Sequence, residues 1–447
     1  MSRAPDRVLR FLRGGTLARL GAASWGQITA ALISLLALRF YTGRMPAAVF
    51  GEAMLVLGVL AFIDGVFGMA FNQTLVVMLK DLATRAARLR LALGLGVLFA
   101  RWTLCIASIA ALVAIAVGMA TGVAPVLLVI GVAAALTYTL VEPVRIIGQT
   151  INLLERRYMS MSSWQAVDAL AGVTTTLVIL HLTRPNPLSL CVGLVGGRLI
   201  STTLFWTMLF GPRALLGADV PQAKAERGRA LRFALPVSAM APLGWASLYI
   251  DRYVVGATIG PASAGLLAAL TGAVTRPYSI VSSALTNFYR PDMLDHVAGR
   301  APAHRHPLRD WIVVAVIAGL IGVAAMVVLG PAIVGFLIRF RTGVTDGATL
   351  LVLIALSQVL VLVTHAIDNQ VLAMERSRSL LGSQSVAVAL GLPMIAAGAL
   401  AGGIVGAAWG RVGNEAVKLV FAAYLLGRPR LRRGAQGTTA QAARESA

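Results

Sequence analysis

The sequence predicts an all-α, polytopic membrane protein with about twelve transmembrane helices, arranged in two pseudo-symmetric six-helix bundles around a central cavity. Three observations predict this fold: an apolar composition, a bias of positive charge toward alternate loops, and a weak internal repeat. Of the 447 residues, 58% are hydrophobic and 13% are charged, against about 45–50% and about 25% in ordinary globular domains. This composition excludes a soluble enzyme, a secreted disulfide scaffold and a disordered chain.

Twelve apolar segments have the length of a membrane span, for which a helix needs roughly 20 mostly apolar residues. They cover residues 20–38, 51–70, 91–118, 124–141, 162–182, 188–210, 233–256, 262–288, 311–338, 348–373, 380–399 and 402–426. The stretches between them are short, so no sizeable domain outside the membrane is expected.

The basic residues predict the orientation of the spans. If both termini lie in the cytoplasm, 28 of the 39 Lys and Arg residues fall in cytoplasmic segments, five in outer loops and six within spans. Cytoplasmic loops of membrane proteins carry an excess of Lys and Arg, so this orientation is favoured. It also accounts for most of the net charge of +21 without a nucleic-acid partner.

The two halves of the chain resemble each other weakly. The pattern V-G-x-x-x-G-R at 192–198 recurs at 405–411, which is 213 residues later. Two shorter matches, Arg39-Phe40 with Arg252-Tyr253 and Glu155-Arg156 with Glu375-Arg376, have offsets of 213 and 220. Such repeats keep the same orientation in the membrane, and in transporters they rock against each other around a central cavity.

These features divide the chain into five parts. They are a basic interfacial segment at 1–17, an N-terminal six-helix bundle at 18–212, a cytoplasmic linker at 213–231, a C-terminal six-helix bundle at 232–427, and a basic, then disordered, cytoplasmic tail at 428–447. Glycines spaced four apart, Gly193 with Gly197 and Gly402 with Gly406 and Gly410, predict close helix packing.

Three arginines within spans are the strongest candidates for a functional site, because charged groups inside a bilayer are costly and usually face a cavity. Arg198 lies about 15 Å into its span at 1.5 Å per residue, Arg411 has the matching place in the second half, and Arg276 precedes Pro277 in the middle of its span. If all three face one cavity, that cavity is cationic. Guanidinium groups bind phosphate and carboxylate, which predicts an anionic substrate or one with a phosphate head.

A second set of charged residues is expected to serve ion coupling or gating: Asp64, Asp168, Asp251, Arg252 and Glu415. Structural roles stay open for several of these residues. Glu415 and Lys418 could neutralise Arg411 along one helix, and Asp64 could pair with Arg276 across the halves. Asp251 and Arg252 lie near the outer end of their span, where long side chains reach the interface at little cost. Glu142 and Arg145 are expected to form a structural i,i+3 pair.

The chain lacks the usual signatures of catalysis. No nucleotide-binding loop, zinc-protease helix or nucleophile elbow is present, and Cys105 and Cys191 lie in apolar runs without a neighbouring Cys/His cluster. No catalytic residue, metal site or cofactor is therefore predicted, and we expect a protein that is not an enzyme.

Several stretches resemble the Wzx-type polysaccharide flippases. They are 44–52, 233–236, 251–256, 264–269, 288–291, 372–378 and 403–408, so the resemblance covers nearly the whole chain. The superfamily is that of the multidrug/oligosaccharidyl-lipid/polysaccharide (MOP) exporters. Its lipid II flippase branch usually has fourteen spans, two more than here. Its multidrug branch often has an acidic residue in the first span, whereas this chain has none between Asp6 and Glu52.

This resemblance implies two six-helix bundles in a V around a cationic cavity, in the bacterial inner membrane. It implies a secondary-type transporter that flips undecaprenyl-pyrophosphate-linked oligosaccharide units for polysaccharide biosynthesis. The partners would be this lipid-linked oligosaccharide, membrane lipid, and a polysaccharide polymerase and chain-length regulator. Two alternatives stay open: a multidrug or metabolite cation antiporter of the same superfamily, and a membrane-embedded polymerase or glycosyltransferase. The short outer loops disfavour the latter.

Overall fold

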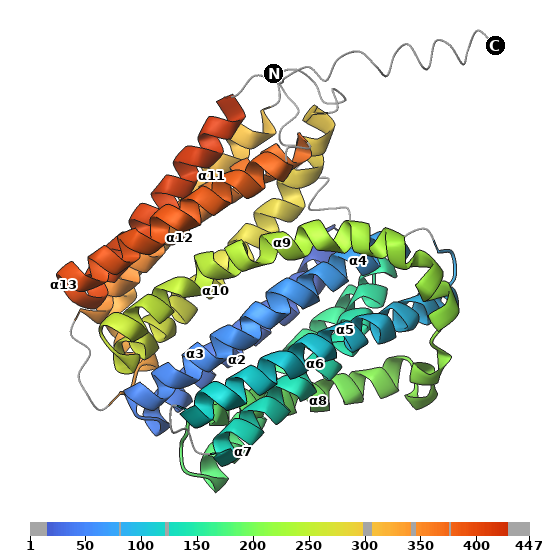
Figure 1. Cartoon of the computed structure of the whole chain (residues 1–447). Coiled ribbons are helices and arrows are strands. Elements are labelled where there is room, and N and C mark those ends of the chain that lie inside the picture. The colour runs from blue at the N-terminus through green and yellow to red at the C-terminus, as the bar shows by residue number, and fades with distance from the viewer. Residues whose placement is uncertain are drawn as a thin grey trace.

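The computed structural model describes residues 16–79, 82–120, 125–297, 306–340, 346–374 and 377–427, which fold into helices joined by short loops (Figure 1). The predicted tail at 428–447 and nearly all of the predicted N-terminal segment lie outside these residues. The N-terminal half contains α2 (Thr16–Arg44), α3 (Ala47–Ile63), η1 (Asp64–Met69), α4 (Ala70–Leu79), α5 (Arg85–Ala120), α6 (Pro125–Leu154), α7 (Tyr158–Leu182) and α8 (Leu188–Leu209). The C-terminal half contains η2 (Pro212–Gly217), α9 (Val220–Thr258), α10 (Pro261–Val297), α11 (Pro307–Leu337), α12 (Gly347–Ala373) and α13 (Ser377–Gly427).

These helices account for all twelve predicted spans and confirm the fold class. In the part of the chain that is described, nine helices are long and apolar enough to cross a membrane. One of them is the continuous rod of α3, η1 and α4, and another is α13, which holds the last two predicted spans. The other two spans correspond to α2 and α10, and both of these helices line the cavity described below.

A reversal at Gly402 and Gly403 divides α13 into two antiparallel helices. Gly403 has φ of 60° and ψ of −144°, a conformation that is readily open only to glycine. After the reversal, Gly406 packs directly against the backbone of Gly398, as a side chain at either position would collide with the other helix. The predicted small-residue packing is therefore present at Gly406, whereas Gly402 lies in the turn itself.

Helix α9 begins well before the apolar segment that it contains. The side chain of Asp219 accepts a hydrogen bond from the backbone N–H of Gln222 at 2.9 Å and so caps the first turn. Most of the predicted linker at 213–231 is helical, because η2 and the first turns of α9 cover it. Hydropathy detects only the apolar part of a helix, so it does not report polar turns that extend beyond the membrane.

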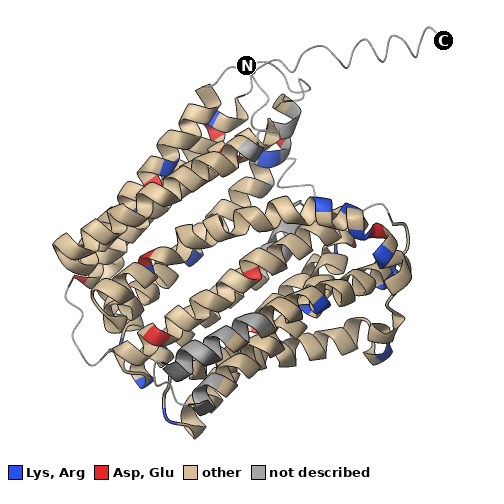
Figure 2. Ribbon diagram, viewed as in Figure 1, with Lys and Arg blue, Asp and Glu red and all other residues tan. Residues whose placement is uncertain are grey.

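The chain forms two helical bundles, one from α2 to α8 and one from α10 to α13, with α9 packing against both (Figure 1). Close packing within the N-terminal bundle depends on glycine. Gly193 and Gly197 of α8 lie against Thr176 and Gly172 of α7 with no room for a side chain. Figure 2 shows long uncharged stretches along most helices, with charges gathered mainly near their ends.

Replacing Gly197 with alanine should loosen this helix pair. The new methyl group would overlap the backbone of Gly172, and overpacking of this kind costs about 1–3 kcal/mol. We expect a lower melting temperature of the purified protein in detergent. Gly228→Ala in α9 is the matched control, since a methyl group there meets open space and alanine favours helix over glycine. Equal melting temperatures for the two variants would contradict the packing argument.

Contacts between the bundles are concentrated at the ends that are predicted to face outside. The end of α2 meets the end of α11, where Thr42 Oγ1 donates a hydrogen bond to the carbonyl of Leu337 at 3.0 Å. Helix α9 meets α3, where the hydroxyl of Tyr253 donates to the carbonyl of Leu55 at 2.7 Å. The central cavity lies halfway along the helices, farther from the predicted outer ends than these contacts.

Candidate functional site

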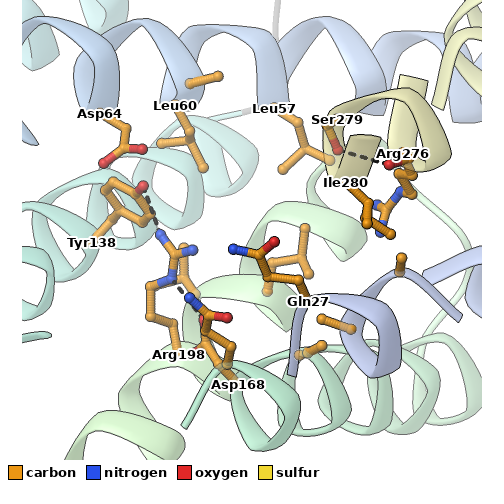
Figure 3. A pocket seen from close by; sticks show the side chains of 18 of the residues that line it. Gln27, Leu57, Leu60, Asp64, Tyr138, Asp168, Arg198, Arg276, Ser279 and Ile280 are labelled. Atoms are coloured by element: carbon orange, nitrogen blue, oxygen red, sulfur yellow. Dashed lines mark hydrogen bonds and ion pairs between the residues drawn. The ribbon is translucent and has the colours of Figure 1, made fainter. Parts of the chain in front are cut away.

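A cavity of about 740 Å³ lies between the two bundles, halfway along the helices (Figure 3). It is lined by helices α2, α3, α7, α8, α9 and α10, together with Asp64 of η1 and Tyr138 of α6. Its charged lining residues are Asp64, Asp168, Arg198 and Arg276. Thus four of the residues singled out from the sequence come together, although they lie up to 212 positions apart in the chain.

Arg198 is placed by the close packing of α8 on α7. Because the glycines of α8 bring the two backbones together, Asp168 of α7 reaches the guanidinium, with Nε and Oδ2 separated by 3.7 Å. Asp168 also accepts a hydrogen bond from Ser201 at 2.5 Å. The Arg198 side chain retains 26% of its exposure and faces the cavity, as Figure 3 shows.

Helix α6 supplies further partners for Arg198. Nη1 of Arg198 donates to the hydroxyl of Tyr138 at 2.7 Å and to Glu142 Oε2 at 3.0 Å. The guanidinium carbon lies 5.1 Å from the centre of the Tyr138 ring. Glu142 also pairs with Arg145, so the predicted i,i+3 pair is present. The sequence shows this local pair, whereas its link to Arg198, 56 residues away, depends on the fold.

Asp64 begins the π-helical turn η1, which interrupts the rod of α3 and α4. Such turns are rare and often occur at functional sites. Gly68 leaves room for the carboxylate, as a side chain there would collide with Asp64.

Arg276 faces the same cavity from α10, on the side away from Arg198 (Figure 3). Its backbone carbonyl accepts a hydrogen bond from Ser279 at 2.7 Å. Within the described ranges, no acidic side chain forms an ion pair with Arg276. The alternative of an Asp64–Arg276 lock is therefore not supported: both residues line the cavity, but they are not paired.

The prediction that Arg411 shares this cavity is wrong. Arg411 does not line it and is 3% exposed inside the C-terminal half, where its Nη1 contacts Asp251 Oδ2 of α9 at 2.5 Å. The suggested ladder along α13 is also wrong for Arg411, since Glu415 pairs instead with Lys418 at 2.6 Å. Arg411 has the same place in its half as Arg198, but a different set of neighbouring helices.

Asp251 is equally buried, at 3% exposure, so its side chain does not reach the surface of the protein. The adjacent Arg252 packs its guanidinium over the ring of Tyr249 at 4.8 Å, and Tyr249 lines the cavity. Asp251, Arg252 and Glu415 are not among the residues that line the cavity. In the parts of the chain that the structure describes, no group of three or more His, Cys, Asp and Glu side chains is arranged to hold a metal ion.

Comparisons of sequence find no match, either among protein-family models or among curated proteins. Solved structures do match over nearly the full length. The eukaryotic MATE transporter AtDTX14 superposes with a TM-score of 0.63 at 14% identity, covering 93% of this chain and 95% of that one. The lipid II flippase MurJ, in an inward closed conformation, gives 0.62 at 10% identity, covering 91% and 87%.

A third match is a MOP superfamily transporter from Pyrococcus furiosus, described as having a binding pocket of reversed polarity. Its TM-score is 0.58 at 12% identity, covering 91% of this chain and 93% of that one. At such low identity the likeness concerns the fold alone. This chain is thus a multi-pass membrane protein with the two-bundle fold of the MATE and MurJ transporters.

Proposed function

We propose that the protein is a secondary-type transporter that flips undecaprenyl-pyrophosphate-linked oligosaccharide units across the bacterial inner membrane for polysaccharide biosynthesis and export. The observation that carries this proposal is Arg276, an arginine without an ion-pair partner among the described residues, in a cavity between two bundles of a transporter fold. Arg276 is half-buried, and a charged residue within a membrane-spanning segment marks a substrate or ion pathway. A passing pyrophosphate would provide the compensating anion.

The distribution of charge in the cavity supports an anionic substrate. Three arginines, Arg145, Arg198 and Arg276, lie at or beside the cavity with three acids, Asp64, Glu142 and Asp168. Arg145 and Arg198 form ion pairs with these acids, whereas Arg276 forms none among the described residues. The positive charge without a compensating acid is therefore located at Arg276.

The geometry suggests how the head group is carried. In this proposal the head group enters the cavity from the cytoplasmic side, since the bundles contact each other at their predicted outer ends, while the prenyl chain stays in lipid. Arginine donors replace water around the phosphates. Rocking of the bundles would then open the outer side. Because a substrate phosphate would compete with Asp168 for Arg198, proton or cation uptake by Asp168 or Asp64 could be coupled to binding.

A multidrug or metabolite cation antiporter is the second candidate. The acidic residues of the cavity, Asp64 and Asp168, favour it, and one solved structure of the same fold is that of a multidrug resistance MATE family transporter. Against it stands Arg276, which would repel a cationic drug. The reversed pocket polarity described for the Pyrococcus protein illustrates that this fold accommodates cavities of different charge.

The proposal includes a cytoplasmic location for both termini, based on the 28 basic residues of the predicted inner segments, and functional partnership with a polysaccharide polymerase and a chain-length regulator. No catalytic role is proposed for any residue.

The test uses a deletion strain, from which undecaprenyl-linked intermediates are extracted while surface polymer is assayed. Loss of polymer with accumulation of a completed repeat unit facing the cytoplasm, restored by the gene in trans, is the expected result. Unchanged polymer together with drug sensitivity would favour the antiporter. An outward-facing, unpolymerised unit would point to a polymerase.

A further inference from the structure

A second cavity, of about 460 Å³, lies in the C-terminal half, at the predicted cytoplasmic ends of its helices. It is separate from the cavity between the two bundles. The ends of α10 and α12 and the beginning of α11 form it, through His296, His306, Pro307, Leu308, Arg309 and Gln370. Small-molecule sites commonly measure about 300–1,000 Å³. These helix ends belong to the predicted cytoplasmic side, where the head groups of the inner leaflet lie. We call this cavity the α11 end site.

The start of α11 provides a positive end to this cavity. Pro307 has no N–H, and the N–H of Asp310 already bonds to the carbonyl of His306 at 3.1 Å. The N–H groups of Leu308 and Arg309 therefore have no partner within the helix, and the side chain of His306, the residue before the helix, makes no capping hydrogen bond. The N-terminus of a helix of 31 residues attracts an anion. The exposed guanidinium of Arg309 adds a full positive charge.

Gln370 independently points to a ligand in the same cavity. Its side chain is 5% exposed, and its amide oxygen is buried without a hydrogen-bond partner. Buried polar atoms nearly always form hydrogen bonds, so we expect this oxygen to accept one from a bound molecule. The ligand that satisfies both features has an anionic group for the helix end and Arg309, and a hydrogen-bond donor for Gln370.

We propose that the α11 end site binds a phosphate ester whose alcohol part carries a hydrogen-bond donor, supplied by the head group of a phospholipid with an ammonium or hydroxyl group. The phosphate lies at the N-terminus of α11 beside Arg309. The donor reaches the oxygen of Gln370, and His296 and His306 flank the head group. A soluble phosphate ester has the same chemistry. The position of the site at the predicted membrane surface favours the lipid.

The test is native mass spectrometry of the purified full chain with phosphatidylethanolamine, phosphatidylglycerol and phosphatidylcholine of identical acyl chains. Phosphatidylcholine carries the phosphate but no donor. We expect it to bind about tenfold more weakly than phosphatidylethanolamine, whose ammonium donates a charged hydrogen bond, and severalfold more weakly than phosphatidylglycerol, whose hydroxyl donates a neutral one. Arg309→Gln should weaken all three lipids, whereas Gln370→Met should abolish the preference and leave phosphatidylcholine binding unchanged.

Arg229→Gln, at an exposed arginine of α9, is the control for general loss of surface charge, and melting temperatures report on folding. Equal binding of the three lipids, or no effect of Gln370→Met in a folded protein, would overturn the proposal. sn-Glycerol 3-phosphate and inorganic phosphate are tested as competitors. Displacement of lipid by glycerol phosphate, with the same dependence on Arg309, would support the phosphate-ester site and overturn the lipid as its source.

Discussion

Arg276→Ala should reduce transport of the lipid-linked substrate by about tenfold or more, because a charge-assisted bond to the pyrophosphate head is lost. The substitution removes no ion pair of the described chain, so the protein should accumulate and melt like the wild type. The measurement is the rate of flipping of a lipid-linked pyrophosphate oligosaccharide in proteoliposomes, at equal protein content.

Two further variants sharpen this prediction. Arg276→Lys keeps the charge but loses the planar pair of donors, and should show an intermediate rate. Arg227→Ala, at an exposed arginine of α9, should transport normally. A wild-type rate for Arg276→Ala would remove this residue from the site, and faster export of a cationic drug by that variant would favour the antiporter.

Arg198 is a less direct test of the same cavity. Its removal would leave Glu142 and Asp168 without the guanidinium that now contacts both. A variant at this position would thus combine loss of transport with loss of stability. Substitution of Arg276 tests transport without this loss of stability, because Arg276 forms no ion pair among the described residues.

Arg411→Ala should destabilise the protein by about 3–5 kcal/mol, the usual cost of leaving one partner of a buried ion pair alone. Asp251, at 3% exposure, would then lack the guanidinium that it contacts and keep only the hydrogen bond from the backbone N–H of Arg252 at 2.8 Å. We expect a markedly lower melting temperature in detergent and poor accumulation in the membrane. The double variant Asp251→Leu, Arg411→Met should recover most of the stability, since apolar replacements of both partners are often neutral or stabilising.

An exposed pair gives the control for this prediction. Arg229 and Glu226 lie 4.0 Å apart at the surface of α9, where ion pairs contribute about 0–1 kcal/mol, so Arg229→Ala should melt near the wild-type temperature. An Arg411→Ala variant as stable as Arg229→Ala would show that Asp251 does not depend on this arginine.

Much of the fold could be predicted because the bilayer imposes it on each segment separately. A span needs a run of apolar residues, and every backbone polar group in lipid must be bonded within its own helix. The segment at 188–210 and helix α8 (Leu188–Leu209) therefore agree to within one residue. The close packing at the glycines of α8 could also be predicted, since close approach of two backbones requires small residues along one face.

The functional site could be predicted only in part. An ionisable residue inside a span indicates an energetic cost, but the sequence does not show which partner offsets that cost. Arg198 and Arg411 illustrate this limit. Both end the same V-G-x-x-x-G-R pattern and lie at matching depths, yet Arg198 faces the cavity beside Asp168 and Glu142, and Arg411 is buried against Asp251.

From the sequence alone, the apolar runs, loop charges and repeat predict the membrane-spanning helices, the two halves and the candidate charged residues. Only the folded chain reveals that Tyr138 and Glu142 hold Arg198, that Arg276 is left without an acid partner, and that Arg411 lies outside the cavity. The physical reason is that insertion of a helix depends on its own residues and the lipid. The pairing of buried charges depends on which other helices, distant in the chain, pack within a few ångströms of them.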